Sequence, residues 1–77
     1  MSPGFLDVMI LLPSLIDGHL KGGLFLEVKT MKGRASPQQK DWIERLNFYG
    51  YHAQIARGAD EMMKLTEGWI SRSPFKQ

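Results

Sequence analysis

The most informative short pattern in the chain is Glu27-Val28-Lys29, in which one residue separates an acid from a base inside an otherwise apolar run, Leu24 to Thr30. Side chains alternate along a strand, so Glu27 and Lys29 are expected on one face, about 7 Å apart. A carboxylate beside a lysine can hold a hard cation and offset negative charge on a phosphate. Taken alone, the same pair is also typical of a solvent-facing ion pair worth under about 1 kcal/mol.

Asp7 is a second acidic residue that we expect to lie near Glu27 and Lys29 in the folded chain. The segment 7–12 is apolar and ends at a proline, which is typical of a buried strand. If segments 7–12 and 24–30 form an antiparallel hairpin symmetric about Gly18, then Leu12 lies opposite Leu24 and Asp7 opposite Lys29. Residues opposite each other share a face, so three ionisable groups are expected to converge. Asp7 alone is more often a turn residue at the start of a strand than a ligand.

The converging groups suit metal-assisted phosphodiester hydrolysis. The carboxylates of Asp7 and Glu27, with the backbone carbonyl of Val28, make an oxygen-only site that favours Mg²⁺ or Mn²⁺. Such a cation polarises a phosphate and lowers the pKa of a bound water. Lys29 can orient that water and offset charge that builds on phosphorus.

Basic residues follow this segment directly. Lys29, Lys32, Arg34 and Lys40 fall within twelve residues that contain no acid, although the net charge of the chain is only +2. A cluster of this kind is most often a solvated loop, but it also suits contact with a nucleic-acid backbone.

The remaining elements follow from turn and capping patterns. Ser36-Pro37-Gln38-Gln39 predicts a helix start with a capping box, in which Ser36 and Gln39 exchange hydrogen bonds, and Gly50 predicts its end. Residues 51–56 read as a third strand, residues 59–70 as a second helix, and residues 71–77 as a frayed end. The order β-β-α-β-α predicts an α/β fold with a small mixed sheet flanked by helices.

Size and composition narrow the class further. With 77 residues and no cysteine, the chain is expected to be one domain, residues 1–77, of an intracellular protein without disulfides. No segment reads as a signal peptide or a membrane span, which suggests the cytosol. So small a core favours self-association, for which Trp69, Met62 and Met63 are candidates, although packing on the chain's own sheet is expected for at least half of them. The aromatics Phe48, Tyr49 and Tyr51 are expected in the core.

Several motifs, in this order, resemble one known family. They are Gly4-Phe5-Leu6-Asp7, then Glu27-Val28-Lys29-Thr30, then Lys32-Gly33-Arg34-Ala35-Ser36-Pro37-Gln38-Gln39-Lys40, then Leu46 and Tyr49-Gly50-Tyr51. Together they resemble the VRR-Nuc (virus-type replication-repair nuclease) family of the PD-(D/E)xK superfamily, over about residues 3–56. The resemblance implies a minimal restriction-endonuclease-like core and a metal-dependent, structure-selective DNA endonuclease. Stand-alone family members look like homodimers that resolve four-way (Holliday) junctions in bacterial or phage-infected cells.

The resemblance also implies roles for individual residues. Asp7 and Glu27 would bind Mg²⁺ or Mn²⁺ together with the Val28 carbonyl, and Lys29 would be the catalytic lysine. Gln39 matches the family's helix glutamine and would lie at the edge of the site, although a capping role alone is equally compatible with its position. The basic residues Lys32, Arg34 and Lys40 would contact branched DNA.

The chain departs from the family pattern in two places. Leu6 stands where the family usually has proline, a change that affects the backbone more than the chemistry. Relatives also carry an upstream helix whose glutamate completes the metal site, and we expect that helix to be absent here. A catalytically impaired module that binds branched DNA is therefore the alternative to an active nuclease, and a small structural or protein-binding domain is a third.

Overall fold

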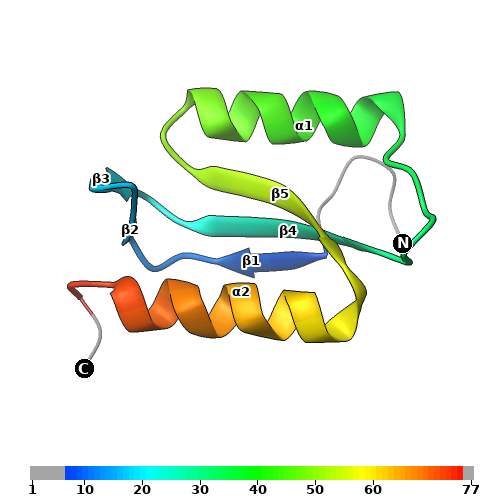
Figure 1. Ribbon diagram of the computed structural model, residues 1–77. Helices are drawn as coiled ribbons and strands as arrows, with labels where there is room; N and C mark the ends of the chain where they lie inside the picture. The colour runs from blue at the N-terminus through cyan, green and yellow to red at the C-terminus, as the bar shows by residue number, and fades with distance from the viewer. Residues whose placement is uncertain (1–6, 76–77) are drawn as a thin grey trace.

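In the computed structural model, which describes residues 7–75, a small sheet lies between two helices (Figure 1). The elements follow in the order β1 (Val8–Ile10), β2 (Ser14–Ile16), β3 (His19–Lys21), β4 (Leu24–Lys29), α1 (Pro37–Phe48), β5 (His52–Arg57) and α2 (Gly58–Arg72). One sheet has the strand order β1-β4-β5, and β2 pairs with β3 in a second. The predicted α/β class with a small mixed sheet is confirmed, and one hairpin lies where the sequence predicted only a loop.

The central strand β4 makes both pairings that the sequence predicts. It runs antiparallel to β1 and parallel to β5. The register with β1 differs from the expected one, because Leu24 pairs with Ile10 and not with Leu12. The difference is two residues, an even number, so each side chain keeps the face on which it was expected.

The small β2–β3 hairpin explains this difference in register. Its turn, Asp17-Gly18, has φ values of 51° and 80°, and positive φ at both central residues is typical of the type I′ turn that suits hairpin twist. Ser14 pairs with Lys21, and three residues (11–13) separate β2 from β1, whereas two (22–23) separate β3 from β4. Pro13 has no N–H to continue the ladder. The turn is centred between Asp17 and Gly18 and not on Gly18, which shifts the register by one residue, and the extra residue between β1 and β2 shifts it by one more.

Helix α2 covers one face of the sheet and supplies the centre of the core. Trp69 is fully buried and packs with Leu24, Leu26 and Ala56. Its indole Nε1 donates a hydrogen bond to the Leu12 carbonyl at 2.7 Å, so the one polar atom of the ring is satisfied. Trp69 is therefore a core residue of this chain and is not available as an interface residue.

The other two interface candidates divide between core and surface. Met62 packs against the core cluster, whereas Met63 is 53% exposed. Packing on the chain's own sheet, the expected outcome for at least half of the three candidates, is confirmed for Trp69 and Met62.

Helix α1 lies on the other side of the sheet (Figure 1) and is fixed at both ends. At its start, Ser36 Oγ accepts a hydrogen bond from the Gln39 amide at 3.1 Å, and Gln39 Oε1 accepts one from the Ser36 amide at 2.9 Å. This is the predicted capping box. In its last turn, the Asn47 side chain donates to the Ala53 carbonyl at 2.9 Å and accepts from the Ala53 amide at 3.0 Å. The helix is thereby tied to β5.

Two sequence expectations about buried residues are wrong. Phe48 and Tyr49 are 81% and 72% exposed, because they lie where α1 ends and the chain turns back to β5. Tyr51 is half-buried and meets Phe25 edge to face, with ring centroids 5.4 Å apart.

The structure describes residues 71–75 at the end of α2, and the expected fraying of residues 71–77 stays a prediction. Helix α2 continues to Arg72, and the buried Ser73 donates through Oγ to the Pro13 carbonyl at 2.6 Å. Residues 76 and 77 lie outside the described residues. No helix in the described part of the chain is long and apolar enough to cross a membrane.

Candidate active site

Strand β4 places Glu27 and Lys29 on the same face of the sheet. The side chain of Glu27 is fully buried, that of Lys29 is 18% exposed, and Lys29 Nζ lies 3.7 Å from Glu27 Oε2. This distance is an ion-pair contact but is too long for a good hydrogen bond. Because Glu27 is buried, the pair is not the solvent-facing pair that the isolated pattern also allowed.

Asp7, the residue before β1, reaches the same strand. Its Oδ2 accepts a hydrogen bond from the Val28 amide at 2.9 Å. Continued by one residue, the β1–β4 register puts Asp7 level with Glu27, whereas the sequence had placed it level with Lys29. The structure therefore brings Asp7, Glu27 and Lys29 together, with the two carboxylates closer to each other than expected.

The Glu27 carboxylate is buried with little hydrogen bonding from the described residues. Neither of its oxygens has a hydrogen-bond partner among the described residues, although both are buried. A buried polar atom left without a partner costs about 1–3 kcal/mol, and more when it is charged. Native structures keep such atoms where function needs them, for example at the position of an ion.

The surroundings of Glu27 also disfavour its ionised form when no cation is bound. Burial raises the pKa of Glu27 above its ordinary value, and the neighbouring Asp7 carboxyl raises it further, while Lys29 partly opposes both effects. Two carboxylates side by side repel each other when both are ionised. A cation held by these two carboxylates would offset their repulsion and supply the Glu27 oxygens with a partner.

The donor set fits a hard divalent cation. Carboxylate oxygens are the ligands that Mg²⁺ and Mn²⁺ prefer. Asp7 supplies one carboxylate from just before β1, and Glu27 supplies the other from within β4. Among the described residues, no group of three or more His, Cys, Asp or Glu side chains could hold a metal ion. Among the described residues the site offers two carboxylates, those of Asp7 and Glu27, and their role as metal ligands, like that of the Val28 carbonyl, stays a prediction.

Gln39 and the basic residues lie in the connection from β4 to α1 and in its first turn. Gln39 is 4% exposed, and its Oε1 is occupied by the capping box. The capping role is therefore observed, and a role at the edge of the site stays a prediction. Lys32, Arg34 and Lys40 are all exposed, as phosphate contacts require.

Arg57 is the residue near this site that the sequence analysis missed. It ends β5 level with Lys29, and its Nη1 donates hydrogen bonds to the carbonyls of Thr30, at 3.0 Å, and of Gly33. The available signal was an arginine at the end of a strand expected to run parallel to β4. That signal alone does not show which backbone atoms the side chain reaches.

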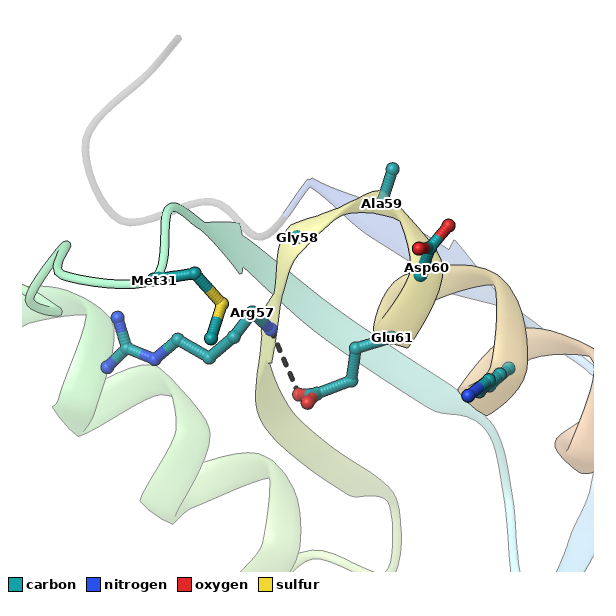
Figure 2. Close-up of a pocket in the computed structure, with 7 residues that line it drawn as sticks. Met31, Arg57, Gly58, Ala59, Asp60 and Glu61 are labelled. Carbon is teal, nitrogen blue, oxygen red and sulfur yellow. Dashed lines mark hydrogen bonds between the residues drawn. The ribbon is translucent and has the colours of Figure 1, made fainter.

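An open hollow lies beside Arg57, at the carboxyl ends of β4 and β5 (Figure 2). It has a volume of about 490 Å³ and is lined by Met31, Arg57, Lys64 and the first turn of α2. Asp7, Glu27 and Lys29 do not line it. The hollow is therefore a neighbour of the carboxylate site and not the site itself.

Comparison with known proteins places this geometry in a family. A family model of the VRR-NUC domain matches residues 2–60. Among solved structures, the chain is similar to a "VRR_NUC domain protein", with 30% sequence identity and a TM-score of 0.80. The similarity covers 91% of this chain and 55% of that protein, so the chain spans little more than half of its length. A search of curated proteins found no match.

Proposed function

The chain belongs to the VRR-NUC family and has a nuclease-type fold of a DNA-processing domain, and we propose that it is a divalent-metal-dependent endonuclease that cleaves branched DNA. Among branched structures we propose the four-way junction as the substrate, because the chain resembles the stand-alone members of the family.

One observation carries the enzymatic part of this proposal. The buried Glu27 carboxylate has no hydrogen-bond donor among the described residues, yet it lies beside Asp7 and 3.7 Å from the Lys29 ammonium. A chain that needed only stability could place an apolar residue here, because a buried ion pair seldom stabilises a fold more than apolar residues do. The arrangement suits a ligand set held on a rigid strand.

Each residue then has a defined task. Asp7 and Glu27, with the Val28 carbonyl, would hold Mg²⁺ or Mn²⁺, which when bound polarises a phosphate and acidifies a water. Lys29 orients the attacking water and offsets the negative charge that develops on the phosphoryl oxygens. Gln39 lies at the edge of the site, and Lys32, Arg34 and Lys40 contact the phosphate backbone.

Homodimerisation follows from the symmetry of the substrate. A four-way junction has two-fold symmetry, so symmetric cleavage of opposing strands needs two active sites related in the same way. Met63 is an exposed apolar residue on α2 that remains available for such a contact.

A second candidate function is supported by the composition of the donor set. Since the described residues contain no cluster of three acidic or histidine ligands, the domain could bind branched DNA without cutting it. This function predicts binding that weakens steeply with salt and no cleavage in any metal.

A cleavage assay separates the two functions. Labelled four-way junction and plain duplex are incubated with the protein in Mg²⁺, in Mn²⁺ and in EDTA. We expect junction cleavage that needs the metal and that is lost in Glu27→Gln, while Glu67→Gln, an exposed acid on α2, serves as the matched control. Cleavage that survives Glu27→Gln or EDTA would refute the enzymatic assignment, and binding without cleavage would favour the second function.

A further inference from the structure

The loop that leaves β4 is closed by a side chain from another strand. The Gly33 amide donates to the Thr30 carbonyl at 3.2 Å, and Arg57 Nη1 donates to both the Thr30 carbonyl and the Gly33 carbonyl. One nitrogen thereby joins the two ends of the turn 30–33. This turn carries Lys32 and leads directly to Arg34.

Arg57 is well suited to this task because its own backbone is fixed. Its amide donates to Glu61 Oε1 at 2.9 Å, which ties the end of β5 to the first turn of α2. The next residue, Gly58, has a φ of +87°, so the chain turns sharply into the helix at this point. Figure 2 shows the Arg57 side chain extending away from Glu61, toward the loop between β4 and α1. One extended side chain, that of Arg57, thus joins the end of β5 to the loop between β4 and α1.

Within residues 7–75, no acidic side chain forms an ion pair with the Arg57 guanidinium. Among the described residues, the ion pairs are Lys29 with Glu27 and Arg45 with Asp41. The bonds of the Arg57 guanidinium to the loop go to neutral carbonyls.

We propose that Arg57 is a positioning residue, which holds the turn 30–33 in the conformation that lets Lys32 and Arg34 contact the DNA backbone next to the carboxylate site. This inference rests on the proposed function, since it assigns a role in recognition of the same substrate. Its effect on DNA passes through the loop and not through a phosphate contact of its own.

A double-mutant cycle tests this mechanism. Junction affinity is measured without divalent metal for the wild type, Arg57→Met, the double variant Lys32→Ala/Arg34→Ala, and the triple variant. We expect Arg57→Met to weaken binding roughly fivefold or more, the effect of losing a charge-assisted contact. In the double-variant background the same change should have almost no further effect, because the contacts that Arg57 positions are already absent.

A second measurement does not depend on DNA. Hydrogen exchange of the Gly33 amide, which closes the turn, should be faster in Arg57→Met than in the wild type, while the core amides of β4 remain protected. If Arg57→Met does not fold, Arg57→Lys, which keeps the charge but lacks the planar fork, takes its place in both measurements.

The outcomes are distinct. An Arg57→Met effect of equal size in both backgrounds would show a direct phosphate contact and overturn the proposal, as would unchanged binding or unchanged Gly33 exchange. A wild-type protein that binds no junction would refute the proposed function, and the exchange measurement would still report whether Arg57 fixes the turn.

Discussion

Asp7 Oδ2 accepts a hydrogen bond from the Val28 amide at 2.9 Å, so the residue before β1 is tied to the strand that carries Glu27 and Lys29. This contact sets the position of one carboxylate relative to the other. The bond involves one oxygen of Asp7, Oδ2. Substitutions at Asp7 can therefore separate the structural role of the residue from its role as a ligand.

We expect Asp7→Asn and Asp7→Ala to differ in stability but to agree in metal affinity. Asparagine keeps an oxygen that can accept from the Val28 amide, whereas alanine loses the bond, at a cost of about 1 kcal/mol. Both changes remove the carboxylate, so both should weaken Mn²⁺ binding. Urea unfolding and calorimetric titration with Mn²⁺ measure the two effects, and full Mn²⁺ affinity in Asp7→Asn would contradict the assignment of Asp7 as a ligand.

The raised pKa of Glu27 should make the stability of the metal-free protein depend on pH. Its pKa is raised in the folded protein above the ordinary value of 4.5, chiefly by burial. Well below pH 4.5, Glu27 is protonated in both the folded and the unfolded form, and its ionisation costs the fold nothing. Between the unfolded and the folded pKa, the folded form binds more protons than the unfolded form, so the free energy of unfolding falls as pH rises. Above the folded pKa, the penalty for a charged Glu27 is fully present.

Glu27→Gln supplies the non-titrating reference for this effect. We expect the free energy of unfolding of the wild type, relative to Glu27→Gln, to decrease by on the order of 1 kcal/mol between pH 4 and neutral pH. Denaturant unfolding at a series of pH values measures it. A difference between the two proteins that does not change with pH would show that Glu27 is not destabilised by burial.

Metal binding should be stoichiometric and should stabilise the fold. With two acidic ligands in the site, we expect one Mn²⁺ per chain, and an increase of about 2.7 kcal/mol in the free energy of unfolding at 100 times the Kd. Native mass spectrometry and thermal unfolding in Mn²⁺ and in EDTA test this, with Glu67→Gln as the unaffected control. Two ions bound per chain would require ligands that the described residues do not supply.

The role of Gln39 can be separated from its capping role by comparison with Ser36. Ser36→Ala and Gln39→Ala each break the capping box and should each cost about 1 kcal/mol of stability. If Gln39 also acts at the edge of the site, only Gln39→Ala slows junction cleavage, by roughly tenfold for one lost hydrogen bond. Equal cleavage rates in the two variants would confine Gln39 to the cap.

Local patterns were enough to predict the parts of the fold that depend on short-range rules. Alternation along β4 predicted the shared face of Glu27 and Lys29, because the side-chain period of a strand is two residues. The capping box at Ser36 and Gln39 depends on residues three apart in the chain and was predicted in full. The family resemblance rests on the same short motifs.

The parts that the sequence did not predict depend on long-range geometry. The β1–β4 register differs by two residues because the hairpin turn is centred between Asp17 and Gly18 and because one more residue separates β1 from β2 than β3 from β4. Phe48 is exposed because α1 covers little beyond β5, and nothing in the sequence of α1 shows where the sheet ends. Arg57 reaches Thr30 and Gly33 only because β5 runs parallel to β4, so its role follows from the folded pairing.

The most direct test of the site is single-turnover cleavage of a four-way junction by Lys29→Met in Mn²⁺, with Mn²⁺ affinity measured on the same protein. The roles assigned to Asp7, Glu27 and Lys29 predict undiminished Mn²⁺ binding and a cleavage rate at least roughly 100-fold lower than that of the wild type, the usual effect of losing a group that stabilises the transition state. Cleavage at the wild-type rate would contradict those roles, whatever the protein binds.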